Sequence, residues 1–170
     1  MKTLVLGGAR SGKSRYAENA ALNLAEGQRS TLYYLATAQP QDEEMQQRIR
    51  CHQQQRDKRW QLIEEPIALA ESLQRLNQSS TVILVDCLTL WLSNCLHHGV
   101  LAEQKAALLN VLPTLEAHIF LVSNEVGSGI VPMGELSRQF VDESGWLHQM
   151  LAQHCDSVTL IVAGLPLGLK

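Results

Sequence analysis

The sequence predicts an α/β fold in which a mostly parallel central sheet carries helices on both faces. Short runs of continuous apolar residues alternate along the chain with longer segments of helix-forming residues. A strand that is apolar on both sides fits a parallel sheet buried between two layers of helices. A glycine-rich turn also joins the first apolar run to the first helical segment. Because 170 residues suit one domain of ordinary size, we expect residues 1–170 to form a single domain.

The first half of the chain begins with a short strand followed by a helix. Residues 3–6 are β-branched and leucine residues stopped by glycines, which predicts a buried strand, and residues 13–25 carry helix-forming side chains. Residues 31–36 (TLYYLA) are the next strand candidate. Residues 42–58 predict a polar helix, and residues 66–76 a further helix.

The second half repeats this alternation. Strands are expected at residues 82–85, 119–122 and 158–162, and helices at residues 88–96, 103–118 and 135–153. Residues 127–134 (GSGIVPMG) are the one loop-like stretch. Too few residues follow this stretch to build a second domain, so we interpret it as an active-site loop rather than a hinge.

Composition and charge exclude several classes of protein. Hydrophobic residues make up 45% of the chain and charged residues 18%, which is typical of a globular protein. A net charge of -3 argues against a nucleic-acid partner, and no apolar run approaches the length of a membrane span. The four cysteines form no CxxC pair, which favours reduced thiols and a cytoplasmic protein.

The glycine-rich turn satisfies the G-x-x-x-x-G-K-[ST] pattern of a phosphate loop. Its residues are Gly7, Gly8, Ala9, Arg10, Ser11, Gly12, Lys13 and Ser14. Glycines let successive backbone N–H groups point at phosphate oxygens, Lys13 neutralises those oxygens, and the Ser14 hydroxyl is a ligand for Mg²⁺. A chance match is the alternative, but this match follows an expected strand and opens an expected helix. The sequence therefore predicts the P-loop class of nucleotide-binding fold, with Lys13 as a catalytic residue.

Two carboxylates follow strands that should end at the same edge of the sheet. Asp86 closes the VILVD run and is the candidate metal ligand, although it could instead cap the helix expected at residues 88–96. Glu125 follows another apolar strand. It could act as a general base for a substrate hydroxyl, support the metal site, or be a solvated loop residue.

The polar helix expected at residues 42–58 contains a second cluster. Arg48, His52 and Arg56 are spaced by four residues, so they share one helical face. A neutral imidazole between two guanidiniums could attack an α-phosphate while the arginines bind the displaced pyrophosphate. A surface histidine on a solvated, charged helix is the alternative.

The chain resembles the bifunctional adenosylcobinamide kinase/adenosylcobinamide-phosphate guanylyltransferase family of cobalamin biosynthesis. The resemblance runs nearly from end to end. It is carried by GGARSGKSRYAE at residues 7–18, ATAQ at 36–39, DEEMQQRIRCHQQQR at 42–56, DCLTLWLSN at 86–94, SNEVGSGIVP at 123–132 and RQFVDESG at 138–145. The joint occurrence of these motifs, in this order, is far more specific than the phosphate loop alone.

This resemblance implies two reactions on a RecA-like P-loop fold. ATP or GTP phosphorylates the aminopropanol hydroxyl of adenosylcobinamide, and GTP then guanylylates His52 with release of pyrophosphate. The GMP passes to adenosylcobinamide phosphate, giving adenosylcobinamide-GDP. The nucleotide contacts that it implies outside residues 7–14 are Ala36, Thr37, Ala38, Gln53, Gln54, Gln55, Arg56, Glu64 and Asp86. It also implies a homo-oligomer that could be a trimer, while Mg²⁺ at Ser14 and Asp86 is expected from the phosphate-loop chemistry.

Two residues depart from the family pattern. Cys51 precedes a single His52 where some members have adjacent histidines, and His148 stands before Gln149 where an asparagine is usual. Two other functions stay open. One is a monofunctional P-loop kinase that leaves His52 idle, and the other is a non-enzymatic nucleotide-binding regulator.

Overall fold

A computed structural model describes residues 1–39 and 57–170, and its centre is a seven-stranded sheet in the order β3-β2-β4-β5-β1-β6-β7. Every neighbouring pair is parallel except β6 and β7, which are antiparallel. The strands are β1 (Lys2–Gly7), β2 (Thr31–Ala36), β3 (Gln61–Glu64), β4 (Thr81–Asp86), β5 (His118–Asn124), β6 (Ser157–Val162) and β7 (Leu165–Gly168). The expected α/β fold with a mostly parallel sheet is confirmed.

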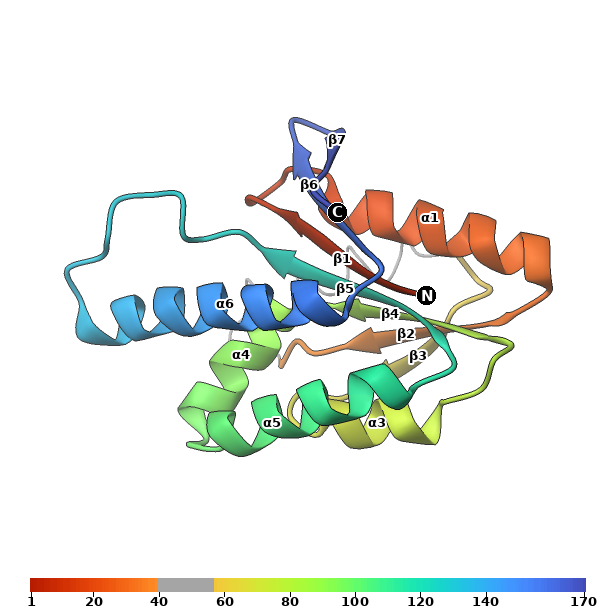
Figure 1. Cartoon of the computed structure of the whole chain (residues 1–170), viewed down its shortest axis with the longest axis horizontal. Coiled ribbons are helices and arrows are strands. Elements are labelled where there is room, and N and C mark those ends of the chain that lie inside the picture. The colour runs from red at the N-terminus through yellow and green to blue at the C-terminus, as the bar shows by residue number, and fades with distance from the viewer. Residues whose placement is uncertain (40–56) are drawn as a thin grey trace.

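Helices cover both faces of this sheet (Figure 1). α1 (Lys13–Gln28) lies on one face. The other face carries α3 (Leu69–Arg75), α4 (Leu88–His97), α5 (Leu101–Val111) and α6 (Glu135–His154). Across residues 1–39 and 57–170, no helix is both long and apolar enough to cross a membrane.

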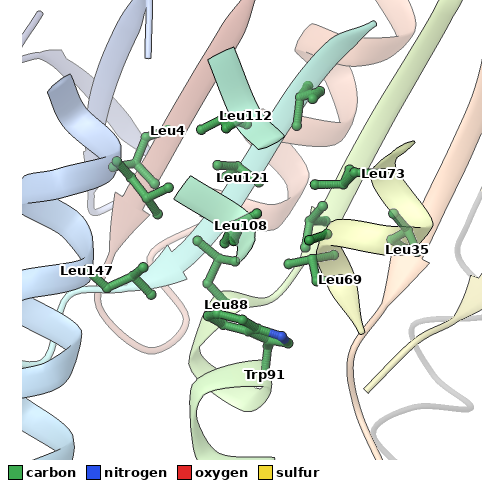
Figure 2. Close-up of a cluster of buried hydrophobic side chains, with 14 of the residues drawn as sticks. Leu4, Leu35, Leu69, Leu73, Leu88, Trp91, Leu108, Leu112, Leu121 and Leu147 are labelled. Atoms are coloured by element: carbon green, nitrogen blue, oxygen red, sulfur yellow. The ribbon is translucent and has the colours of Figure 1, made fainter. Parts of the chain in front are cut away.

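Each face of the sheet has its own hydrophobic core because successive side chains of a strand point to opposite sides. In β1, Leu4 belongs to the cluster beneath the four helices, whereas Val5 packs against α1. Figure 2 shows the larger cluster, where Leu121 of β5 lies beside Leu108 of α5 and Leu147 of α6 points into the same space. Burying each such leucine contributes about 1.5–3 kcal/mol, so these contacts fix the helices on the sheet.

Two strands were not expected from the sequence. β3 is a four-residue edge strand with no buried residue, and β7 is an exposed antiparallel edge strand. Neither has the continuous apolar run that predicts a central strand. β3 pairs with β2 across a long stretch of chain, whereas β7 pairs with β6 directly after a two-residue turn.

Some expected helix boundaries were wrong. The helix expected at residues 103–118 ends at Val111, continues as the 3₁₀ turn η1 (Leu112–Thr114), and gives way to β5 at His118. Pro113 lies within that turn, and its missing N–H and fixed φ oppose an α-helix there. The helix expected at residues 66–76 begins only at Leu69. Most of the helix expected at residues 42–58 lies outside the described residues, and its last two residues are not helical.

Candidate nucleotide-binding site

The phosphate loop joins β1 to α1 at the carboxyl edge of the parallel strands. Arg10 and Gly12 have positive φ angles of 57° and 93°, so the backbone turns through the left-handed region twice in three residues. Glycine tolerates this conformation at Gly12 without the steric cost that a side chain would add. The Ser11 N–H donates to the Gly8 carbonyl at 3.2 Å, which closes the turn. The motif therefore has the strand–turn–helix setting that phosphate binding requires.

The start of this loop is packed too closely for any side chain. A Cβ added at Gly7 would lie 2.4 Å from Ser11 Oγ and 2.7 Å from the carbonyl oxygen of Ile161. The Gly164 N–H donates to the Ser11 carbonyl at 2.8 Å, so the turn between β6 and β7 supports the loop from outside. These contacts pack the loop against the end of β6 and the turn that follows it.

Lys13 is the first residue of α1 and is only 9% exposed. Its Nζ donates to the Gly8 carbonyl at 3.1 Å, and no described carboxylate lies within ion-pair distance of it. The hydroxyl of Ser11 is also buried without a partner among the described residues. A buried ammonium without a counter-charge is costly, and a bound phosphate would supply that charge.

The amino-terminal end of α1 adds to this positive site. Its N-cap, Gly12, makes no side-chain capping bond, and the first turn contains no acidic residue. The first N–H groups of a helix have no intrahelical acceptor and form the positive end of its dipole. An anion at this end would satisfy them.

Three residues predicted to contact the nucleotide form one row across the carboxyl edge. Ala36 of β2 is paired with Glu64 of β3 on one side and with Asp86 of β4 on the other. The missed strand β3 is what brings Glu64, an exposed residue, into this row. These strand ends are where ligands bind in open α/β sheets.

The Asp86 carboxylate does not cap α4, so that alternative is wrong. Cys87 is the N-cap of α4 and makes no side-chain capping bond, while Asp86 Oδ2 accepts a hydrogen bond of 2.8 Å from the Tyr34 hydroxyl. That bond fixes the carboxylate and leaves Oδ1 for another ligand. The donor set of Ser14 and Asp86 consists of oxygen atoms, which Mg²⁺ prefers, so these residues fit the predicted metal.

Thr37, the middle residue of the predicted 36–38 contact, is fully buried. Its hydroxyl donates to the Cys87 carbonyl at 2.7 Å and accepts from the Cys87 N–H at 3.0 Å. Asn94 of α4 donates to the Thr37 carbonyl at 2.9 Å. The Thr37 side chain therefore joins the end of β2 to the start of α4, and its contact with nucleotide stays a prediction. Asn94 was missed, although an asparagine within the apolar DCLTLWLSN run was a signal.

The end of β5 contacts the phosphate loop directly. The Glu125 N–H donates to the Gly7 carbonyl at 3.1 Å. The Glu125 carboxylate accepts from the N–H groups of Gly127 and Ser128 at 2.8 and 3.3 Å. Burial raises the pKa of Glu125, but hydrogen bonds from Ser128 and Gly127 outweigh it and hold the pKa below its ordinary value. The carboxylate thus organises its own loop and is a weak base.

The predicted nucleophile cannot be placed relative to this loop. His52, its neighbour Cys51, and the predicted contacts Gln53, Gln54, Gln55 and Arg56 all lie outside the described residues. Their roles stay predictions from the sequence.

A family model and two curated relatives all identify the same protein family. The family model described as "Cobinamide kinase / cobinamide phosphate guanyltransferase" matches residues 3–169. The chain is 50% identical over 173 residues to the bifunctional adenosylcobalamin biosynthesis protein CobP of Pseudomonas aeruginosa, covering 100% of this chain and 98% of the relative. It is 35% identical over 187 residues to the bifunctional adenosylcobalamin biosynthesis protein CobU of Escherichia coli, covering 100% of both.

Solved structures agree on the fold. The ATPase domain of G40P has a TM-score of 0.51, with 94% of this chain and 68% of that chain covered. A KaiC-like protein from Pyrococcus horikoshii has a TM-score of 0.54, with 94% and 69% covered. Both are 12% identical in sequence to this chain, so the likeness concerns the fold alone. The expected RecA-like P-loop fold is confirmed.

Proposed function

The chain belongs to the cobinamide kinase / cobinamide phosphate guanyltransferase family, and we propose that it divides the two reactions of that family between two sets of residues. Residues 7–14 hold the nucleotide that phosphorylates adenosylcobinamide. His52 carries GMP from GTP to adenosylcobinamide phosphate. The observation that supports the first half is the buried ammonium of Lys13, which has no described counter-charge at the amino-terminal end of α1.

In the kinase step, the aminopropanol hydroxyl of the acceptor attacks the γ-phosphorus of ATP or GTP. The bond from the γ-phosphorus to the bridging oxygen breaks, the nucleoside diphosphate leaves, and the hydroxyl proton is released. Lys13, the Ser11 hydroxyl and the loop N–H groups stabilise the charge on the transferred group. Mg²⁺ held by Ser14 and Asp86 would neutralise further phosphate charge. Positioning and charge stabilisation supply most of the rate in this class of reaction, so a strong base is not required.

In the transferase step, His52 attacks the α-phosphorus of GTP, and the bond to the β-phosphate breaks. Pyrophosphate leaves, held by the arginines on either side of His52. A phosphate oxygen of adenosylcobinamide phosphate then attacks the phosphorus of the guanylyl-histidine, which releases His52 and forms adenosylcobinamide-GDP. A covalent intermediate of this kind predicts ping-pong kinetics.

Labelling with GTP that is radioactive at the α-phosphate tests the covalent step. We expect wild-type protein to acquire an acid-labile, alkali-stable label with Mg²⁺ present, and His52→Ala to acquire none while it keeps its kinase activity. His98→Ala is a matched control because His98 is an exposed histidine, and it should label like wild type. Kinase activity without any label on wild-type protein would leave a monofunctional kinase.

The expected substrates, assembly and location of the protein have different kinds of support. Membership of the family supports a nucleotide and cobinamide as substrates. Assembly into a homo-oligomer such as a trimer, and a cytoplasmic location without a nucleic-acid partner, are proposals from the sequence. Sedimentation of the purified protein would test the assembly.

A further inference from the structure

Three polar side chains from three different elements meet beside the phosphate loop. Ser123 of β5 is 1% exposed, and its Oγ lies 2.7 Å from Nε2 of His148 on α6. The hydroxyl of Thr89 on α4 lies 3.5 Å from the same Ser123 Oγ. We call these three residues the Ser123 cluster. His148 stands where the family pattern has an asparagine, and the sequence alone assigns it no partner.

The hydrogen bonds of the cluster run in one direction when His148 is neutral. Thr89 Oγ1 already accepts from the Asn124 N–H at 2.8 Å, so its own proton can point toward Ser123 Oγ or toward the nearby Cys87 sulfur. The Ser123 hydroxyl can then donate to Nε2 of His148, which accepts only in the neutral imidazole. Burial favours that neutral form and lowers the pKa of His148, against the attraction of the Glu125 carboxylate, which raises it.

The cluster holds the segment of β5 that touches the phosphate loop. Ser123 is paired with Leu6, and Asn124 with Gly7, the first residue of that loop. The next residue, Glu125, donates its N–H to the Gly7 carbonyl. On the other side of β5, Val122 is paired with Asp86. A shift at the end of β5 would therefore reach both the phosphate loop and the predicted metal ligand.

The cluster is not needed to dock α6 on the sheet. Leu147 and Leu151 of α6 are almost fully buried in the larger core, as Figure 2 shows for Leu147. Burial of two leucines contributes several times the net stabilisation of one hydrogen bond, which is about 1 kcal/mol. A polar contact that adds little to docking but fixes a strand end next to the catalytic loop suits a positioning role.

We propose that His148 is a positioning residue for phosphoryl transfer, which holds the end of β5 and its bond to Gly7 in place through the Ser123 hydroxyl. This inference rests on the proposed kinase function. It concerns the reacting geometry rather than nucleotide affinity, because His148 bonds to Ser123 and not to the loop itself. Misplacement of reacting groups by a fraction of an ångström to an ångström lowers turnover by about 10- to 100-fold.

Kinase turnover of His148→Ala, His148→Gln and Ser123→Ala tests this role. Gln can place a neutral amide close to where the imidazole Nε2 lies. We expect kcat to fall about 10- to 100-fold in both alanine variants with the KM for nucleotide within about 2-fold of wild type. His148→Gln should recover most of that loss, and the double alanine variant should lose no more than either single variant.

His154→Gln is the matched control because His154 lies on the same helix and is exposed; it should behave like wild type. Guanylylation of His52 and denaturant unfolding are measured on every variant. Guanylylation should stay near wild type, and unfolding should show no more than the small loss expected for one hydrogen bond. A His148→Ala protein that keeps wild-type kcat overturns the positioning role, as does a folded His148→Gln protein as slow as His148→Ala. If His148→Ala does not fold, Ser123→Ala and His148→Gln decide by the same criteria. Wild-type protein without kinase activity would overturn the proposed function itself, and this role with it.

Discussion

The two edges of the central sheet differ in how deeply they bury a lysine and in the polar groups around it. At the carboxyl edge, Lys13 is buried without a counter-charge among the described residues, although its Nζ donates to the Gly8 carbonyl. The Ser11 hydroxyl is buried there without a partner in the part of the chain that the structure describes. At the amino edge, the polar groups around Lys2 and His118 have partners, whereas the buried Ser30 hydroxyl just before β2 has none among the described residues. Lys2 Nζ donates to the Leu115 carbonyl at 2.6 Å, and the Lys2 N–H donates to Asp156 Oδ2 at 2.6 Å. His118 contacts Gln28 Oε1 at 2.9 Å through Nε2.

From this difference we infer that the carboxyl edge serves ligand binding and the amino edge serves the stability of the sheet. At the amino edge no buried ammonium among the described residues needs an anion, and the bonds of Lys2 and His118 hold strand ends together. An edge with unsatisfied polar groups is destabilised until a ligand arrives. Substitutions at the carboxyl edge should therefore lower activity more than stability, and substitutions at the amino edge should do the reverse.

The largest effect is expected for Lys13→Met. Loss of the ammonium should lower kinase kcat/KM by about 10²- to 10³-fold. Removal of one preorganised hydrogen-bond donor that stabilises transition-state charge has an effect of this size in other enzymes. The free energy of unfolding should stay level or rise, because a buried charge without a counter-ion is removed. Steady-state kinetics and urea unfolding check both parts.

Lys2→Met is the matched change at the amino edge. It should keep wild-type kinetics and lower stability by about 1 kcal/mol, the net value of a typical hydrogen bond. A Lys13→Met protein that is active but unstable would contradict the comparison.

Gly7→Ala should be the next largest change. The added Cβ would lie 2.7 Å from the backbone carbonyl of Ile161, which cannot move as a flexible side chain could. We expect loss of nucleotide binding and destabilisation of about 1–3 kcal/mol, as in an overpacked core. Calorimetric titration with GTP and thermal unfolding measure these two effects.

Gly27→Ala is the control because nothing lies within 4 Å of its added Cβ. Gly27 is within α1, so alanine there should stabilise by about 0.5–1 kcal/mol and leave binding unchanged. Normal GTP binding by Gly7→Ala would show that the loop is not packed as described.

Asn77→Ala should destabilise the protein by about 1–2 kcal/mol without lowering activity. Asn77 Oδ1 accepts from the N–H groups of Glu116 and Ala117, at 2.7 and 3.1 Å, just before β5 begins. Ala117 is fully buried, so its N–H would lose its partner out of reach of water. Urea unfolding and kinase kinetics check this prediction, with the exposed Gln78→Ala as control. If Asn77→Ala lowered kcat as much as Lys13→Met does, the claim that amino-edge residues serve stability rather than catalysis would be wrong.

The smallest effect is a dependence of stability on pH. Burial, together with the charges of the N-terminal amine and Lys2, lowers the pKa of His118 below its ordinary 6.5, and burial lowers that of His148. The unfolded chain then binds more protons than the folded one, so stability is full above about pH 6.5 and falls as pH drops through that value toward the folded pKa.

Urea unfolding at about pH 7.5 and about pH 5.5 measures this dependence. His118→Gln should flatten part of it while leaving kinase activity intact. If the free energy of unfolding of His118→Gln changed with pH as much as that of wild type, groups other than His118 would cause the pH dependence.

The sequence predicted the phosphate loop because all of its determinants are local. The motif that ends in Gly12 and Lys13 is continuous in the sequence and lies between an apolar strand and a helix. The order of these residues is therefore enough to predict the phosphate-binding turn. Asp86 was predictable for the same reason, as the acidic end of a continuous apolar run.

Contacts that join distant elements were not predictable. His148 meets Ser123 across 25 residues of chain, and Asn94 meets Thr37 across 57. No local pattern encodes which side chains face each other after the helices pack. The edge strand β3 was missed for a similar reason, since it is held by pairing with the distant β2. β7 pairs with the adjacent β6 and was missed because its short, exposed sequence lacks a strand pattern.

Hydrogen–deuterium exchange with and without GTP and Mg²⁺ tests the contrast between the two edges most directly. The account predicts added protection of backbone amides in residues 7–14 and around Asp86 and Glu125. It predicts no change around Lys2 or in residues 115–118, which lie at the opposite edge from the phosphate loop and already bond to Asp156, Asn77 and Gln28. Protection centred on the amino edge, or none in the phosphate loop, would contradict the assignment of nucleotide binding to the carboxyl edge.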